Sequence, residues 1–213
     1  MSLYLDSAIA EDVRRAFDTG LVKGITTNPS LIAQTKRAAV EVIGELCDLS
    51  TGIVFYQLAE TDRAGRKSEA IRMTGIRPGR VGLKIPCTYE NLSLATELIG
   101  MGYIVGITAI FSTPQVFLAC QAGAQYILPY VNRSTRLLGD GISLVHQMRA
   151  VIDSERSNTQ IIAASVKTPE EAISTLLAGA HHLTLPIRLI ESMGDHPLSD
   201  KAIEDFRLAA KQE

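Results

Sequence analysis

Residues 80–88, R-V-G-L-K-I-P-C-T, contain a lysine whose surroundings could make its amine reactive. Aliphatic residues alternate there with Gly82 and Lys84, so a strand would turn the aliphatic side chains to one face and Lys84 to the other, with Gly82 leaving room beside the amine. Pro86 would end this strand. Burial disfavours protonated lysine, which lowers its pKa and raises the fraction of neutral amine that can attack a carbonyl. Lys84 is therefore a candidate Schiff-base nucleophile; the alternative is a lysine that reaches water along its alkyl stem.

Other polar side chains stand near the ends of apolar segments elsewhere in the chain. Each follows a different segment: Asp6, Asn28, Gln57, Thr108, Tyr130 and Ser165. Each also has a structural interpretation, because Asp6 and Asn28 are good helix caps and the others can end strands, cover an edge or bond to the backbone. If these side chains converged at one rim, a shared functional site would be favoured over separate structural roles. The arrangement of the helices and strands therefore decides between the two interpretations.

The elements that would position these side chains are eight short strands that alternate with helices. The strands are predicted at residues 3–5, 24–27, 52–58, 81–85, 103–110, 125–131, 160–166 and 181–185. Short loops are typical of parallel βαβ units, and eight units favour a closed (β/α)8 TIM barrel over an open sheet. Such a barrel brings the carboxyl ends of all strands to one rim. We expect an α/β fold with one domain over residues 1–213 and an additional C-terminal helical arm at about 198–212.

Capping residues mark several helix starts. Asp6 and Ser7 are expected to cap one helix, and Asn28 another, with Pro29 at its first position. Residues 168–171, T-P-E-E, form a capping box. Further helices are predicted at residues 39–47, 61–75, 90–101, 114–123, 140–152, 186–193 and 198–210.

Composition and charge exclude several classes of function. The chain has 213 residues, a formal net charge of −2 and no basic run, which argues against a nucleic-acid partner or a polybasic membrane patch. Cys47, Cys87 and Cys120 show no C-x-x-C spacing, so reduced thiols are expected rather than a disulfide framework or a zinc site. No window approaches the roughly 20 apolar residues of a membrane span, and no signal-peptide pattern is present. We expect a soluble, cytoplasmic protein that binds small polar or anionic molecules.

Five segments resemble one known family. In chain order they are L-Y-L-D-S, G-I-T-T-N-P-S-L-I-A, V-G-L-K-I-P-C-T, Y-V-N-R and A-A-S-V-K-T-P. They resemble the transaldolase family, in particular its small branch that contains fructose-6-phosphate aldolase. The resemblance implies that Lys84 forms a Schiff base with the ketone of the donor and that Asp6 moves the proton during carbon–carbon cleavage. Because an iminium accepts the electrons released by the breaking bond, this chemistry requires no metal and no cofactor.

The resemblance also implies how water and protons are handled. In the aldolase branch a glutamine, a threonine and a tyrosine hold the catalytic water, and they match Gln57, Thr108 and Tyr130. Transaldolases carry glutamate and phenylalanine in the glutamine and tyrosine places, so the chain resembles the aldolase branch at both. Glutamine orients water but accepts no proton, which makes Tyr130 the expected partner of Asp6. Lowering the pKa of Lys84 from about 10.4 to near 7 would correspond to roughly 4 to 5 kcal/mol.

A sugar phosphate is the substrate class that the resemblance implies. Asn28 and Ser165 would hydrogen-bond the dihydroxyacetone hydroxyls, and Thr26 belongs to the same substrate site. Arg133, with Ser165 and Lys167, resembles the family's site for the acceptor phosphate, because a planar guanidinium suits a tetrahedral anion. The alternative for the two cations is a solvated surface position.

Several residues depart from the aldolase pattern and leave the activity open. Gly106 stands where a larger aliphatic residue is usual and Leu128 where a small one is usual, and by parity both would face the pocket. Residues 134–135 also differ, and Arg136 could join the anion site or face water. The candidates are an aldolase acting on a ketose phosphate such as fructose 6-phosphate, a transaldolase, and an enzyme for a sulfonated analogue. A non-catalytic barrel that binds sugar phosphates is an alternative of another class.

The sequence and the family resemblance also lead to expectations about metal binding and assembly. The four histidines show no ligand spacing with paired carboxylates, which argues against a zinc aldolase. Small members of the family form rings of five or ten subunits in which the last helix reaches a neighbour. The resemblance therefore implies a homo-oligomer, a pentamer or a decamer.

Overall fold

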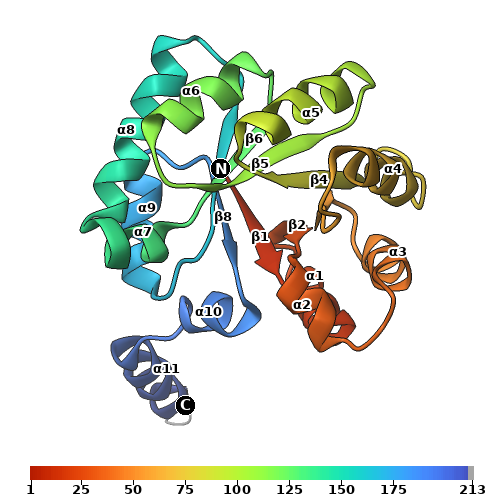
Figure 1. The fold of residues 1–213 in the computed structure, drawn as a ribbon. Coiled ribbons are helices and arrows are strands. Elements are labelled where there is room, and N and C mark those ends of the chain that lie inside the picture. The colour runs from red at the N-terminus through yellow and green to blue at the C-terminus, as the bar shows by residue number, and fades with distance from the viewer. Residues whose placement is uncertain (211–213) are drawn as a thin grey trace.

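Eight parallel strands close into a barrel at the centre of the molecule (Figure 1). The structure is a computed structural model and describes residues 1–210. Each strand pairs with its neighbours in sequence, and β1 pairs with β8 to close the barrel. The strands are β1 (Ser2–Asp6), β2 (Val22–Thr26), β3 (Val54–Gln57), β4 (Val81–Pro86), β5 (Val105–Ile110), β6 (Tyr126–Pro129), β7 (Gln160–Ala163) and β8 (His182–Leu185). The predicted single-domain (β/α)8 TIM barrel is confirmed.

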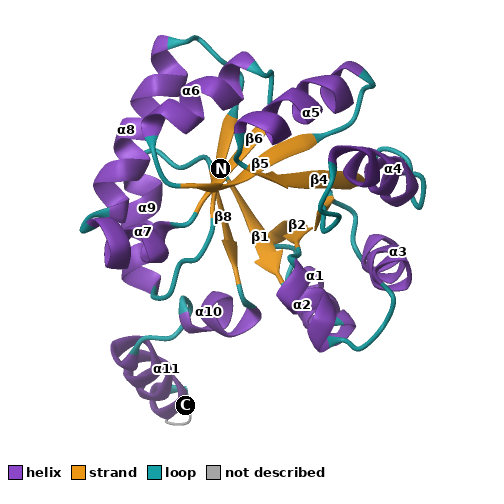
Figure 2. Ribbon diagram, viewed as in Figure 1, coloured by secondary structure: helices purple, strands orange, loops and turns teal. Residues whose placement is uncertain are grey.

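Helices surround the strands as an outer ring (Figure 2). They are α1 (Ala10–Asp18), α2 (Pro29–Gln34), α3 (Ala39–Leu49), α4 (Arg63–Thr74), α5 (Tyr89–Gly100), α6 (Thr113–Gln121), α7 (Val131–Leu138), α8 (Gly141–Ser154), α9 (Pro169–Leu177), α10 (Ile187–Ser192) and α11 (Pro197–Ala209). Every strand-to-strand connection contains at least one helix, as parallel pairing requires.

The two faces of the strands build separate cores. Outward aliphatic side chains such as Leu83 are fully buried in the core that includes the helices. The inward side chains Tyr4, Phe55, Leu128 and Ile162 form a second, smaller core. This alternation confirms the predicted parity of β4, because its aliphatic residues face the helices while Lys84 faces the barrel interior.

Two glycines allow large inward side chains to approach the strands closely. A Cβ atom on Gly82 would lie 2.7 Å from the Phe55 ring, and one on Gly106 would lie 2.7 Å from Cδ1 of Leu128. Real Cβ atoms do not approach ring or methyl carbons so closely, so a larger residue at either position would force the Phe55 ring or the Leu128 side chain to move. The expectation that Gly82 leaves room beside Lys84 is therefore wrong, because the Phe55 ring fills that space.

Two predicted helix starts are confirmed. Asn28 caps α2, and its Oδ1 accepts a hydrogen bond from the Leu31 backbone N–H at 3.0 Å. Thr168 caps α9, and its Oγ1 accepts from the Glu171 N–H at 3.1 Å. The capping box is only half formed, because Glu171 Oε2 accepts from the backbone N–H of Lys167 at 2.7 Å.

The predicted cap of the first helix is wrong. Helix α1 begins after Ile9, which makes no side-chain capping bond. Ser7 lies two residues earlier, where its Oγ accepts from the Ile9 N–H at 3.1 Å and donates to Asp12 at 2.7 Å. Asp6 ends β1, and its carboxylate faces the barrel interior.

Helix α7 was not predicted from the sequence. Strand β6 ends at Pro129 rather than at Val131, and α7 follows almost at once. Its first turn is fixed by tertiary hydrogen bonds, from the Val131 N–H to the Ala164 carbonyl at 2.9 Å and from the Asn132 N–H to the Ser165 carbonyl at 3.0 Å. The helix therefore begins directly beside the carboxyl end of β7.

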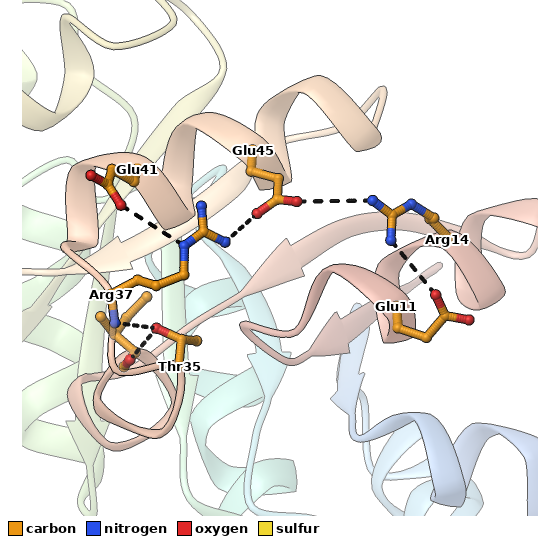
Figure 3. A network of polar contacts seen from close by, with 7 residues as sticks. Glu11, Arg14, Thr35, Arg37, Glu41 and Glu45 are labelled. Atoms are coloured by element: carbon orange, nitrogen blue, oxygen red, sulfur yellow. Dashed lines mark hydrogen bonds and ion pairs between the residues drawn. The ribbon is translucent and has the colours of Figure 1, made fainter.

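An ion-pair network joins α1, α3 and the segment between α2 and α3 (Figure 3). Glu45 of α3 lies 3.9 Å from Arg14 of α1 and 2.5 Å from Arg37. Arg14 also pairs with Glu11 at 3.6 Å, and Arg37 pairs with Glu41 at 3.8 Å. These pairs lie at the surface, where solvent screening leaves each one weak, but together they connect the end of α2 to its neighbours.

Helix α11 stands apart from the helical ring (Figure 1). None of its residues is buried, and it exposes Leu198, Ile203, Phe206 and Leu208. The predicted additional C-terminal helix is confirmed, although positions 211 and 212 of the expected arm lie outside the described residues. Among residues 1–210, no helix is both long enough and apolar enough to cross a membrane.

Candidate active site

A cavity of about 490 Å³ opens at the carboxyl ends of the strands. It is lined by Asp6, Thr26, Asn28, Pro29, Ser30, Leu31, Gln57, Lys84, Tyr130, Arg133, Ala164, Ser165 and Lys167. Every site residue predicted from the sequence lines this cavity except Thr108, which is fully buried beneath Tyr130. The barrel therefore brings together side chains that are far apart in the sequence.

Lys84 lies on β4 with only 4% of its surface exposed. Its Nζ donates a hydrogen bond to the Thr27 carbonyl at 2.7 Å. Burial lowers the pKa of Lys84 to about 8, and the negative charge of Asp6 limits this fall. At pH 7, a pKa of about 8 leaves roughly a tenth of the amine neutral, about 300 times the neutral fraction of an ordinary lysine. The shift is smaller than the one to near 7 expected from the sequence.

Asp6 projects into the same cavity from the end of β1. Its Oδ1 accepts a hydrogen bond from the Thr26 hydroxyl at 2.8 Å. Burial raises the pKa of Asp6, while the Lys84 charge, the Thr26 hydrogen bond and the Lys167 charge oppose the rise. The amine and the carboxylate are thus electrostatically coupled, as an acid/base pair around one reacting carbon requires.

Gln57 lines the cavity from the end of β3 and Tyr130 lines it from just beyond β6, while the buried Thr108 of β5 contacts Tyr130. Among the described residues, no group donates a hydrogen bond to the buried Oε1 of Gln57. The Thr108 hydroxyl donates to the Tyr130 hydroxyl oxygen at 3.4 Å, which leaves the Tyr130 proton available to a bound molecule. The Tyr130 ring is held by the edge of Phe111, with ring centroids 5.8 Å apart.

Two residues with left-handed backbone conformation flank the site. Ala109 has φ 56° at an irregularity in the pairing of β5 with β6, directly after Thr108. Ser165 has φ 58° just beyond β7. Non-glycine residues rarely adopt this conformation, and it persists where the surrounding structure imposes it. Here it bends the chain at two strand ends that carry site residues.

Arg133 and Lys167 give the cavity a positive rim. Arg133 lies in the first turn of α7, with its guanidinium carbon 4.9 Å from the centre of the Tyr130 ring. Lys167 lines the cavity from the loop between β7 and α9. Arg136, the third cation considered from the sequence, is exposed and does not line the cavity. With Lys84, the rim cations outnumber the Asp6 carboxylate and favour an anionic ligand.

Solved structures with the same fold are distant in sequence. A mutant flavocytochrome b2 with pyruvate bound superposes with a TM-score of 0.62 at 13% identity, covering 88% of this chain and 56% of that chain. A mandelate oxidase mutant with the monooxide FMN adduct gives a TM-score of 0.63 at 13% identity, covering 87% and 64%. At this level of identity the likeness shows the barrel fold alone.

Sequence comparison is more specific. A model of the family described as Transaldolase/Fructose-6-phosphate aldolase matches residues 3–213. A probable transaldolase of Hyphomonas neptunium is 37% identical, covering 100% of this chain and 98% of the relative. A probable transaldolase of Agathobacter rectalis is 38% identical, covering 97% and 96%. This chain belongs to the transaldolase/fructose-6-phosphate aldolase family. It is therefore an enzyme of the transaldolase type, and the family acts on sugar phosphates.

Some residues in or beneath the cavity were not predicted from the sequence. Ser30 and Leu31 line it from the first turn of α2, next to the predicted Asn28. Thr184 of β8 lies beneath, with its Oγ1 2.6 Å from the Thr26 Oγ1. Alternate residues of a strand point to the same face, so Thr184 points into the barrel together with His182. This alternation along β8 was the signal that could have predicted Thr184.

The two departures from the aldolase pattern lie beneath the cavity. Gly106 and Leu128 face the barrel interior as predicted, but neither lines the cavity. Leu128 instead packs in the inward core with Tyr4 and Phe55. The expectation that both residues face the pocket is wrong, because they lie under its floor. There the small Gly106 makes room for the large Leu128, so the two departures compensate each other in volume.

Proposed function

We propose that this enzyme is a Schiff-base (class I) aldolase that cleaves or forms the bond to a dihydroxyacetone unit of a ketose phosphate such as fructose 6-phosphate. The observation that carries the proposal is the buried Lys84 amine, with its lowered pKa, in one cavity with the Asp6 carboxylate. An amine in this setting is a nucleophile near neutral pH, and a carboxylate beside it can exchange protons with the bound sugar.

The reaction follows from these two groups. The neutral Lys84 amine adds to the C2 ketone of the sugar, and loss of water gives an iminium. A base removes the proton of the C4 hydroxyl, the C3–C4 bond breaks, and its electron pair moves into the iminium to give an enamine and glyceraldehyde 3-phosphate. Protonation of the enamine carbon and hydrolysis of the resulting iminium release dihydroxyacetone and restore Lys84. Asp6 is the group proposed to move the protons.

A water held by Gln57, Thr108 and Tyr130 would connect Asp6 to the sugar. The unpartnered Gln57 Oε1 can accept a hydrogen bond from this water. Tyr130 can donate to it, because its own oxygen already accepts from Thr108. The Gln57 side chain neither gains nor loses a proton, so Asp6 and Tyr130 are the groups that exchange protons through the water.

The substrate is proposed to lie with its phosphate toward α7. Arg133 and Lys167 supply the charge, and Ser165 adds a hydroxyl at the same rim. Asn28 uses its Oδ1 to cap α2, so its amide nitrogen is the atom left to donate to the dihydroxyacetone hydroxyls. Thr26 contributes through its contact with Asp6.

A transaldolase that transfers the dihydroxyacetone unit between sugar phosphates is the second candidate, because the named relatives are called probable transaldolases. Gln57 and Tyr130 support the aldolase, since transaldolases carry glutamate and phenylalanine there. Cleavage of fructose 6-phosphate measured with and without erythrose 4-phosphate separates the two. Turnover that requires the acceptor identifies the transferase, and a sulfonated sugar tested in parallel addresses the third candidate. The family's enzymatic character argues against the non-catalytic barrel.

Borohydride reduction in the presence of fructose 6-phosphate tests the covalent step. We expect a stable adduct on Lys84, located by peptide mass spectrometry, and no adduct in Lys84→Met. Lys23→Met is the matched control, because it removes an exposed lysine that does not line the cavity and should leave the adduct on Lys84. Unmodified Lys84 in the folded wild-type enzyme would exclude the Schiff-base mechanism.

We also infer that the enzyme works in the cytoplasm as a homo-oligomer, a pentamer or a decamer. The support is the exposed apolar surface of α11, which finds no cover within residues 1–210 of a single chain.

A further inference from the structure

Thr184 extends the hydrogen bonding of Asp6 across the barrel interior. It lies on β8 with 2% of its surface exposed. Its Oγ1 is 2.6 Å from the Thr26 Oγ1, and Thr26 donates to Asp6 Oδ1 at 2.8 Å. Because β1 pairs with β2 on one side and β8 on the other, both neighbours of the Asp6 strand supply a hydroxyl.

The direction of this hydroxyl chain depends on the protonation state of Asp6. A threonine hydroxyl has one proton and can donate only once. An ionised Asp6 only accepts, so Thr26 donates to it and Thr184 must donate to Thr26. Both hydroxyl protons are then used. If Asp6 donated to Thr26 instead, Thr26 would turn to Thr184, whose own proton has no acceptor among the described residues. A buried donor without an acceptor is costly.

We propose that Thr184 is a positioning residue of the active site, whose hydroxyl fixes Thr26 as a donor to Asp6 and so favours the ionised carboxylate. The inference rests on the proposed function for its catalytic meaning, since an ionised Asp6 is the form that takes a proton from the sugar. Thr184 itself does not line the cavity and does not touch the substrate.

Several charged and titratable groups around Asp6 also affect its titration. Lys84 of β4, Lys167 of the loop after β7, Arg133 of α7 and Tyr130 after β6 line the same cavity. Replacing Thr184 changes none of these charges. A shift in the titration of Asp6 would therefore report on the hydroxyl chain alone.

The test is the titration of the Asp6 carboxyl carbon by NMR in protein labelled with [4-13C]aspartate, with the signal assigned by its loss in Asp6→Asn. Thr184→Val preserves the shape and removes the hydroxyl, whereas Thr184→Ser keeps the hydroxyl. Because one hydrogen bond contributes about 1 kcal/mol, we expect Thr184→Val to raise the Asp6 midpoint by about 0.5–1 pH unit and Thr184→Ser to restore most of the difference. An unchanged midpoint in Thr184→Val would overturn the proposal.

Two further measurements keep the result interpretable. The acidic limb of the kcat/KM profile should move with the midpoint, giving about a threefold to tenfold loss of kcat/KM below it and no loss on the alkaline side. If Thr184→Val does not fold, as judged by circular dichroism, Thr184→Ala is titrated under the same two outcomes. The NMR titration needs no turnover, so failure of the Schiff-base proposal at Lys84 leaves this test valid.

Discussion

At the scale of single residues, burial moves the pKa values of Lys84 and Asp6 toward each other. Loss of solvation lowers the pKa of the ammonium and raises that of the carboxylic acid, and each charge limits the shift of the other. The alternation around Lys84 in the sequence was enough to predict its inward direction. It could not predict the size of the shift, which depends on Asp6, more than seventy positions away in the chain and adjacent only once the barrel closes.

His182 is another buried titratable residue, and it lies near the amino-terminal ends of the strands, at the opposite end of the barrel interior from the cavity. Its Nε2 lies 2.8 Å from Gln160 Oε1, and its buried Nδ1 has no hydrogen-bond partner among the described residues. Burial, together with the charge of the neighbouring His181, lowers the pKa of His182 to about 4. The unfolded state, with a pKa near 6.5, therefore binds more protons between these values.

This difference predicts an acid-sensitive fold. The contribution of His182 is fully present above about pH 6.5 and is lost as the pH falls toward 4, with a loss of about 2 kcal/mol of unfolding free energy at pH 5. Urea unfolding at pH 7.5 and pH 5 measures it at fixed protein concentration. We expect His182→Gln to reduce the pH dependence and the exposed His146→Gln to leave it unchanged. Equal pH dependence in wild type and His182→Gln would contradict the assignment.

At the scale of elements, α7 shows what local sequence cannot reveal. In the segment V-N-R-S-T-R-L-L, the weak helix formers Val, Asn, Ser and Thr make up half of the residues, and the segment follows a strand directly. Its helical start depends on the carbonyls of Ala164 and Ser165, which lie just beyond the end of a different strand, β7. By contrast, Asn28 and Thr168 cap their helices with side-chain bonds that are local in sequence, and both were predicted correctly.

Glu171 connects the two elements that carry the rim cations. Its Oε1 accepts from the Asn132 side-chain amide at 3.2 Å, and its Oε2 accepts from the Lys167 N–H at 2.7 Å. Asn132 precedes Arg133 on α7, so one carboxylate holds the helix start and the Lys167 loop together. This use of Glu171 explains why the predicted capping box is not completed.

Replacing Glu171 should therefore weaken substrate binding more than turnover. Glu171→Gln keeps the size of the side chain but turns one acceptor into a donor that faces another donor. We expect KM for the sugar phosphate to rise by about threefold to tenfold, which corresponds to about 1 kcal/mol, with kcat nearly unchanged. The neighbouring exposed Glu170→Gln is the control and should behave as wild type. A fall in kcat at constant KM would show that the link acts on the chemistry instead.

At the scale of the whole molecule, the barrel was predictable because its eight strands alternate with helices in a regular order. What fills the barrel was not predictable. Phe55 crosses β4 at Gly82, and Leu128 crosses β5 at Gly106, so the inward core closes the barrel beneath the cavity. Such pairs are separated by more than twenty residues, and their fit appears only after the register between neighbouring strands is set.

Helix α11 is a part of the molecule that a single chain leaves uncovered. Leu198, Ile203 and Phe206 lie on one side of the helix at spacings of three to five residues, and all are exposed. An amphipathic helix with no buried residue gains little by folding alone, so its stability requires a partner surface. The fold of the barrel does not depend on α11, because both cores are built from other elements.

We expect α11 to hold the oligomer together. Phe206→Asp places a charge in the apolar stripe and should reduce the molar mass measured by size-exclusion chromatography with light scattering, while the circular dichroism of the barrel is preserved. Glu204→Gln is the matched control, because it changes the net charge by one unit on the opposite side of the helix and should leave the assembly intact. If α11 forms the contact between subunits, the subunits of the Phe206→Asp variant must dissociate. A wild-type protein that is monomeric at micromolar concentration, or a Phe206→Asp variant that keeps the wild-type mass, would show that the exposed stripe serves a different purpose.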